Sequence, residues 1–385
     1  MNKIKWINFL HIYQPPWQDE GTIKQVSSES YEYLIWLFKK YPKFKCTLNI
    51  TGSLVDQLEK FRPDLLIELK KLVNKNQIEL TGSAKYHAFL PMLPKKEIIR
   101  QINLNQDTLK KYFNLKKIKG FYLPEMGFNL EVVKIVKKMG FKWIILDPIS
   151  YIGKNETDIL YKLKNININV VFRNRKISKQ YPPEIIYKKL KTNFKNQIIL
   201  SAHDGETYGH FHEDWQGCIE KVIKDDRIII QTISKYIKSL KNQKNINLRN
   251  STWETREYEI KNKKPYIFWN DPKNKIHQNL WKLLYYSIKL LNKYKKDSSW
   301  KWARIHLDQG LSSCTFWWST GKKPATFSSL TWSPDMIDNG AEELIRSIRS
   351  LKNASINEKI KAEKIYLEIK KDIWITHWKK FNKKL

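Results

Sequence analysis

The first 270 residues of the chain alternate between short apolar segments and longer amphipathic ones. The short segments have the length of buried strands, and in the longer ones apolar residues recur three or four positions apart, as in helices. Strands are expected at residues 5–10, 45–50, 77–80, 118–123, 142–146, 168–172 and 197–201, with an eighth candidate at 246–248. Helices are expected between them at residues 31–40, 54–74, 95–113, 130–139 and 218–240. This alternation predicts βαβ units and a parallel sheet, and seven or eight such units fit a closed barrel better than a small open sheet.

The pattern changes after about residue 271, where only helical periodicity continues. Helices are expected at residues 275–295, 300–320, 334–351 and 356–381. No Gly/Ser-rich linker precedes this region, so we expect it to pack on the barrel. The predicted domains are therefore a barrel over residues 1–270 and a helical region over residues 271–385.

Composition narrows the class of protein. With 41% hydrophobic residues the chain can bury a sizeable core, which excludes a wholly disordered basic protein. It has no run of about 18–20 apolar residues, so no membrane span is predicted. Its N-terminal segment contains Lys5 and lacks the cleavage site of a signal peptide. The three cysteines are widely spaced and odd in number, which argues against a disulfide framework and favours a reducing, cytoplasmic location.

The charge balance of 71 basic against 38 acidic residues gives a net charge of +33, which raises the question of nucleic-acid binding. The lysines are spread along the chain as single residues or pairs, whereas binding surfaces concentrate their charge. Lys, Ile and Asn are all abundant and share AT-rich codons, so genome composition explains the excess. We interpret the charge mainly as solvated surface; nucleic acid is not the favoured partner, but affinity for a polyanion stays open.

Polar residues cluster where the predicted strands end, and in a parallel barrel these ends carry the reacting groups. Five of the eight histidines lie in these few segments. The two strongest candidates for reacting carboxyl groups are Glu125 and Asp204. Each follows an apolar predicted strand by two or three residues and precedes a turn with glycine. A single such carboxylate is more often a helix cap or a structural ion pair. A pair at one barrel end has the composition of a glycosidase site, in which two carboxyl groups flank the bond to be cleaved.

A metal site competes with this interpretation. His203, His210 and His212 lie close in sequence to Asp204 and Asp214, which makes the segment rich in ligand types. Neither a His-x-x-His nor a His-x-x-x-His motif occurs, so we assign no metal and no cofactor.

Taken together, the motifs resemble those of glycoside hydrolase family 57. They occur in the family's order between residues 11 and 318. The matching residues are His11, Gln14 and Pro15 in the opening motif, Tyr86 and His87 in the next, Leu123, Pro124, Glu125 and Gly127 in the nucleophile motif, Asp204, Glu206, Gly209 and His210 in the acid/base motif, Arg173 within residues 171–178, and residues 311–318 in the final motif.

This resemblance implies an α/β fold, a distorted (β/α)7 TIM-like barrel followed by a C-terminal α-helical region. It implies a retaining hydrolase or transglycosylase on α-linked glucans, of the α-amylase, 4-α-glucanotransferase or branching-enzyme type. Glu125 would be the nucleophile and Asp204 the general acid/base. The residues expected to bind substrate or orient the carboxyls are His11, Gln14, His87, His203, Glu206, His210, Arg173, Trp269 and Trp317; the two tryptophans would stack on sugar faces.

Two positions depart from the family pattern, and both bear on sugar binding. Tyr13 stands where a second histidine is usual, and Cys314 stands near the place of an acidic residue, for which Asp308 is no obvious substitute. Two other functions stay open: a metal-dependent polysaccharide deacetylase on a similar barrel, and a non-catalytic glycan- or polyanion-binding protein. The sequence sets neither the oligomeric state nor the choice between hydrolysis and transfer.

Overall fold

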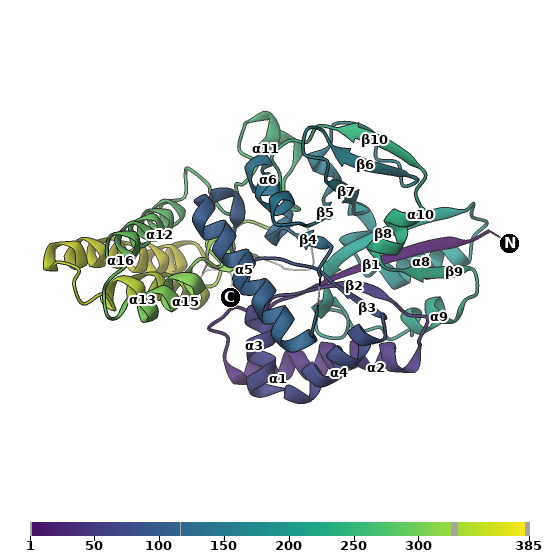
Figure 1. The fold of residues 1–385 in the computed structure, drawn as a ribbon, viewed down its shortest axis with the longest axis horizontal. Helices are drawn as coiled ribbons and strands as arrows, with labels where there is room; N and C mark the ends of the chain where they lie inside the picture. The colour runs from purple at the N-terminus through teal and green to yellow at the C-terminus, as the bar shows by residue number, and fades with distance from the viewer. Residues whose placement is uncertain (1, 116, 325–329, 382–385) are drawn as a thin grey trace. The chain divides into compact units, whose positions relative to one another are not determined.

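The computed structural model describes residues 2–115, 117–324 and 330–381, and the chain forms two compact units (Figure 1). The first unit comprises Met1–Gln14, Gln18–Lys85 and Leu90–Trp253. The second comprises Pro15–Trp17, Tyr86–Phe89 and Glu254–Leu385. The domain boundary at residue 270 and the packing of the helical region on the barrel stay predictions.

The first unit contains a ring of parallel strands that matches the expected barrel. One sheet has the order β3-β2-β1-β8, and the other contains the order β7-β5-β4. In the described part of the chain the ring strands are β1 (Ile4–Ile12), β2 (Cys46–Ile50), β3 (Ile78–Leu80), β4 (Gly120–Tyr122), β5 (Trp143–Leu146), β7 (Asn169–Phe172) and β8 (Gln197–Asp204). All seven strands expected from the apolar pattern are confirmed.

Two narrow seams join the sheets into the ring. At the first, Gly82 forms a parallel bridge with Phe121; the Gly82 N–H donates to the Gly120 carbonyl and the Tyr122 N–H donates to the Gly82 carbonyl, both at 2.9 Å. At the second, the Asn174 N–H donates to the Leu200 carbonyl at 2.6 Å. The short length of these seams makes this a distorted (β/α)7 barrel, as expected.

Side chains alternate across the barrel wall with the two-residue period of a strand. On β1, Ile4, Trp6 and Leu10 pack in the core under the helices. The intervening Ile7 and Phe9 pack in a second core cluster, with Leu200 and Ala202 of β8. This second cluster fills the barrel interior.

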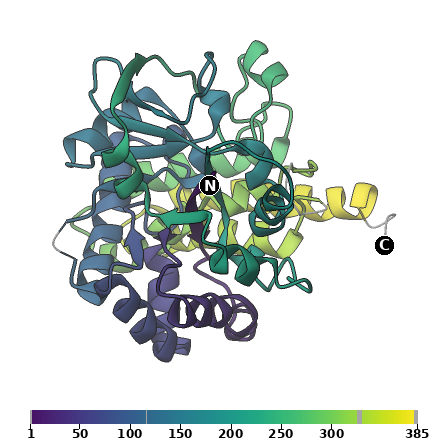
Figure 2. The same cartoon turned by 90° about the vertical axis from the view of Figure 1, so that its right-hand side faces the viewer.

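The helices around the barrel cover its outer face. Figures 1 and 2 show α1–α4, in purple, gathered on one side of the strands. The helical segments of the first unit are α1 (Glu20–Val26), the π-helical η1 (Ser27–Tyr31), α2 (Glu32–Lys40), α3 (Gly52–Phe61), α4 (Pro63–Asn74), η2 (Leu90–Met92), α5 (Lys95–Phe113), η3 (Pro124–Met126), α6 (Leu130–Lys138), η4 (Pro148–Ser150), α7 (Arg175–Ser178), α8 (Pro182–Leu190), η5 (Gly205–Thr207), α9 (Cys218–Lys224) and α10 (Ile233–Ser239).

Three expectations for the first unit were wrong in detail. The helix at 54–74 divides at Arg62, because Pro63 disfavours helical backbone at the residue before it. The helix at 218–240 is interrupted by β9 (Ile228–Gln231), whose β-branched Ile run pairs with β1. The candidate strand at 246–248 begins earlier, as β10 (Asn242–Ile246), and pairs with β6 (Ile159–Leu163), which was not expected.

The second unit is built mainly of helices, as expected. Figure 1 shows α12, α13, α15 and α16 lying together as a bundle. Its helical segments are α11 (Glu257–Lys261), α12 (Lys275–Lys293), α13 (Trp300–Gly310), α14 (Ser313–Trp318), α15 (Pro334–Arg349), α16 (Ile356–Thr376) and the π-helical η6 (His377–Phe381). The single helix expected at 300–320 is therefore two helices. None of the helices in the described ranges combines the length and the apolarity needed to cross a membrane.

Candidate active site

Strand register places two predicted residues on the interior face of the barrel. His11 continues the side of β1 that carries Ile7 and Phe9, and Asp204 continues the side of β8 that carries Leu200 and Ala202. The two residues are also direct partners across the β1–β8 ladder. Because both stand at the carboxyl ends of their strands, they lie where parallel barrels carry reacting groups.

Glu125 lies in the tight turn η3, directly after β4. Its backbone is left-handed (φ 62°, ψ 15°), and Met126 follows with φ 49°. The turn is held by the Trp253 N–H, which donates to the Glu125 carbonyl at 3.0 Å. The Glu125 side chain is buried, with 6% of the residue exposed.

Tyr122 lies within electrostatic reach of both predicted catalytic carboxyls. Burial raises the pKa of its hydroxyl, the charges of Glu125 and Asp204 raise it further, and the Arg173 charge opposes them. Its ring packs 4.8 Å from that of His11. Sequence reasoning missed Tyr122, because an aromatic residue inside a strand is typical of a core; its place three residues before Glu125 is the signal that could have identified it.

Two predicted histidines are buried and neutral. Burial lowers the pKa of His11 to about 4, and it does the same for His203. The His11 Nδ1 lies 2.8 Å from Asn49 Oδ1, and the His203 Nδ1 lies 3.0 Å from the Asp204 carbonyl oxygen. Because both partners are acceptors, each Nδ1 carries the proton and each Nε2 is an acceptor. The His203 Nε2 is buried with no hydrogen-bond partner in the described part of the chain, so it is suited to a sugar hydroxyl.

Glu206 is the second carboxyl of the segment after β8, and it is 4% exposed. Its Oε1 accepts hydrogen bonds from the Tyr31 hydroxyl at 2.6 Å, the Tyr13 N–H at 3.4 Å and the Gln14 side-chain amide at 3.5 Å. Burial, and then the Asp204 charge, raise the pKa of Glu206 to about 8. The structure thus brings the predicted Gln14 and Glu206 together and adds Tyr31, which sequence reasoning had treated only as the start of a helix.

Arg173 is a buried residue whose side chain connects several segments of the barrel. Its Nε lies 2.8 Å from Asp147 Oδ2, and both side chains are 1% exposed. Its Nη1 donates to the Ala202 carbonyl at 3.1 Å and its Nη2 to the Trp253 carbonyl at 3.2 Å. These contacts connect β8 with the residue that holds Glu125, so Arg173 supports the position of both carboxyls.

Asp147→Asn is expected to lower the free energy of unfolding by about 3–5 kcal/mol, since it leaves a buried guanidinium without its counter-charge. Chemical denaturation measures this. The control Glu59→Gln breaks an exposed pair with Lys111, 3.6 Å apart, and is expected to cost less than about 1 kcal/mol. Equal losses in the two variants would contradict a structural role for the buried pair.

The other histidines of the segment after β8 have separate carboxylate partners. His210 pairs through Nδ1 with Glu29, and the His212 Nε2 lies 3.0 Å from Glu184. In the described ranges no group of three or more His, Cys, Asp or Glu side chains is arranged to hold a metal ion. The potential metal ligands of this segment therefore contact several different partners.

Three predicted residues belong to the second unit. His87 is buried with φ 53°, and its Nδ1 lies 2.9 Å from the Ser313 hydroxyl. Trp269 is fully buried and stacks on Phe89 at 5.0 Å, which is a packing arrangement. Trp317 is half-buried and packs edge-on against Trp318. Their roles in sugar binding stay predictions.

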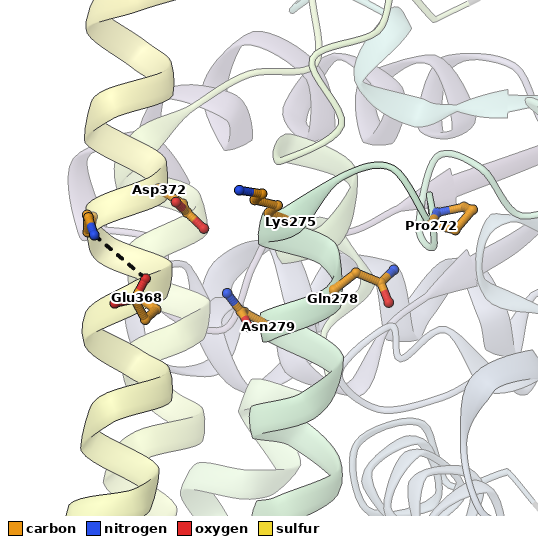
Figure 3. Close-up of a pocket in the computed structure, with 7 residues that line it drawn as sticks. Pro272, Lys275, Gln278, Asn279, Glu368 and Asp372 are labelled. Atoms are coloured by element: carbon orange, nitrogen blue, oxygen red, sulfur yellow. Dashed lines mark ion pairs between the residues drawn. The ribbon is translucent and has the colours of Figure 1, made fainter.

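A polar groove of about 500 Å³ lies between α12 and α16 of the second unit (Figure 3). It contains none of the predicted residues and mixes charges of both signs. Its lining residues are Pro272, Lys275, Gln278, Asn279, Glu368, Lys371 and Asp372. Asp308, in the same unit, is paired with Arg304 at 2.6 Å, so it is committed to a structural contact.

Comparison with known proteins gives consistent matches. The chain is 24% identical over 258 residues to an alpha-amylase of Pyrococcus horikoshii, an alignment covering 62% of this chain and 40% of the relative. The chain thus spans less than half the length of this relative. Its fold matches the crystal structure of 4-alpha-glucanotransferase from Thermococcus litoralis with a TM-score of 0.69 at 17% identity, covering 91% of this chain and 60% of that one. It matches the GH57-type branching enzyme of Pyrococcus horikoshii with a TM-score of 0.68 at 15% identity, covering 95% and 94%.

The family model described as glycosyl hydrolase family 57 matches residues 9–249. That range runs from within β1 to just past β10, and it includes both Glu125 and Asp204. Because the match covers more than half of the chain, the chain belongs to glycosyl hydrolase family 57.

Proposed function

We propose that this chain is a retaining enzyme that cleaves α-linked glucans through a glycosyl-enzyme intermediate, as a hydrolase or a transglycosylase. The observation that carries the proposal is the pair of carboxyls at the carboxyl ends of two barrel strands, Glu125 after β4 and Asp204 on β8, whose charges both act on the Tyr122 hydroxyl. The printed names of the relatives, alpha-amylase, 4-alpha-glucanotransferase and branching enzyme, support an α-glucan as substrate.

In the first step Glu125 attacks the anomeric carbon and Asp204 gives its proton to the glycosidic oxygen. The bond from carbon to the leaving oxygen breaks as the bond to the Glu125 carboxylate forms. In the second step Asp204 takes a proton from the acceptor hydroxyl, which attacks the same carbon and releases Glu125. Water as acceptor gives hydrolysis, and a sugar hydroxyl gives transfer. His11 and His203 would accept hydrogen bonds from sugar hydroxyls.

The test is turnover of maltooligosaccharides by the purified chain, followed by reducing-end release and by chromatography of product lengths. We expect shorter products, longer products or both, with the α-configuration retained in products observed by NMR. An inverted anomer would contradict the double-displacement mechanism. Absence of turnover on a panel of α-glucans would contradict the proposed function.

The deacetylase alternative is tested on acetylated chitooligosaccharides. We expect no release of acetate, with or without added zinc, and no effect of a chelator on glucan turnover. Chelator-sensitive deacetylation would favour that alternative instead. The polyanion-binding alternative predicts salt-sensitive retention on immobilised nucleic acid or acidic polysaccharide without any turnover.

A cytoplasmic location stays a prediction. It is supported by the three cysteines, Cys46, Cys218 and Cys314, which all lie in the described ranges and are free and buried.

A further inference from the structure

A π-helical turn packs against the loop that follows β8. The helical backbone from residue 20 to residue 40 contains one π turn, η1, in which the Glu32 N–H donates to the Ser27 carbonyl five residues earlier. One residue inserted into a helical turn rotates the following side chains by about 100°. Such turns are often found at functional sites, and this one presents three consecutive residues to a single loop.

Each of these three residues contacts the 204–210 loop. The Tyr31 hydroxyl donates to Glu206 Oε1 at 2.6 Å, and the Ser30 hydroxyl donates to the Gly205 carbonyl at 3.1 Å. The Glu29 carboxylate pairs with His210. The same turn approaches the loop backbone so closely that a Cβ at Gly209, which has φ +101°, would collide with the Glu29 carbonyl.

We propose that the turn Ser27–Tyr31 is a clamp on the loop that carries Asp204, and that Tyr31 is a positioning residue acting through Glu206. The proposal rests on the proposed function for the role of Asp204. Neither the turn nor Tyr31 is among the motif residues that resemble those of the family.

The clamp matters for chemistry because Glu206 and Asp204 compete for a proton. Burial and the Asp204 charge raise the pKa of Glu206, and the Tyr31 hydrogen bond opposes that rise by favouring the ionised carboxylate. The titratable groups facing Glu206 are Asp204 on its own loop and Tyr31 on η1; the segment after β1 presents the uncharged amides of Tyr13 and Gln14. When the two carboxyls share one proton, only a proton on Asp204 can be given to the glycosidic oxygen. The Tyr31 hydrogen bond favours this arrangement, because it stabilises the ionised form of Glu206.

The test is the pH profile of kcat/KM for Tyr31→Phe on a maltooligosaccharide. Without the hydroxyl, Glu206 holds its proton to higher pH, so a proton shared with Asp204 stays on Glu206 over a wider pH range. We expect kcat to fall about tenfold and the alkaline limb to move down by about one pH unit. A uniform loss at every pH, or an unchanged profile, would overturn the positioning role.

Tyr41→Phe is the matched control, because the Tyr41 hydroxyl also bonds a carboxylate, that of Glu220, away from the loop. Its profile should not move. A second pair of variants tests the clamp without touching Tyr31. Ser30→Ala loses the bond to Gly205 and is expected to lower kcat a few-fold. Ser239→Ala, whose hydroxyl bonds within its own helix α10 to the Tyr236 carbonyl, should leave kcat unchanged.

A second readout separates failure of the clamp from failure of the proposed function. Folding raises the pKa of Glu206 from its ordinary 4.5 to about 8. The protonated carboxyl therefore contributes stability that is fully present below about pH 4.5 and is lost as the pH rises to about 8. Tyr31→Phe should therefore lower Tm more at pH 9, where Glu206 is ionised, than at pH 5. That pH dependence should vanish in a Glu206→Gln background. An inactive wild type with this Tm pattern would overturn only the function; an active wild type without it would overturn the clamp.

Discussion

Replacing Glu125 with glutamine is expected to lower kcat on α-glucans by at least about a thousandfold while the barrel stays folded. The amide has the shape of the carboxyl but cannot form the glycosyl-enzyme. The contact that holds the turn survives, because the Trp253 N–H donates to the Glu125 backbone carbonyl and not to the side chain. Initial rates with maltooligosaccharides and far-UV circular dichroism measure the two halves of the expectation.

Chemical rescue sharpens the test. In Glu125→Gly, azide should occupy the space of the carboxylate, attack the anomeric carbon from the same face and give a β-glycosyl azide, with the anomeric configuration inverted once instead of twice. Glycine also tolerates the left-handed backbone at this position. The control Glu131→Gln, at an exposed position of α6, should keep wild-type kcat. Full activity in Glu125→Gln would exclude Glu125 as the nucleophile.

Asp204→Asn is expected to lower kcat on the same substrates by about a hundredfold to ten-thousandfold, the range associated with loss of a general acid. The loss should be much smaller with α-glucosyl fluoride, because fluoride departs without a proton. Glycosylation of Glu125 then proceeds, and the intermediate accumulates because no base activates the acceptor. Comparison of the two substrates, with mass spectrometry of the trapped protein, measures this.

Glu213→Gln, exposed in the segment that follows the same strand, serves as the control and should leave both rates unchanged. Equal losses on the glucan and on the fluoride would indicate that Asp204 does not deliver the proton. The two variants together separate the roles. Azide should give a product of inverted configuration only when Glu125 is replaced, and a better leaving group should restore turnover only when Asp204 is replaced.

The barrel was predictable because its ring strands are short buried runs between amphipathic segments. β6 and β10 were harder to place, and for β10 the reason is plain: four of its five residues are exposed, so the strand is polar and carries no apolar signal. β9 was hidden inside a longer segment with helical periodicity, and tertiary pairing with β1 decided its conformation.

The positions of the two carboxyls that we propose as the catalytic pair were predictable for a related reason. Glu125 follows β4 closely and Asp204 ends β8, so topology alone places them at the same end of the ring. Tyr31 and Tyr122 were not predictable as site residues, because a tyrosine in a helix or strand is typical of packing. The contact between Tyr31 and Glu206 spans 175 positions and depends on a π turn with no sequence signature.

The left-handed backbone at Glu125 and Met126 has a consequence for the stability of the chain. Such conformations cost about 1–3 kcal/mol for residues other than glycine and asparagine. Glycine at either position would remove that cost, and two consecutive strained residues make the gain available twice. The proposed nucleophile thus occupies a position where a residue with a side chain lowers the stability of the turn. Activity and stability are therefore opposed at Glu125, and a chain that loses the carboxyl there would gain resistance to unfolding as it lost turnover.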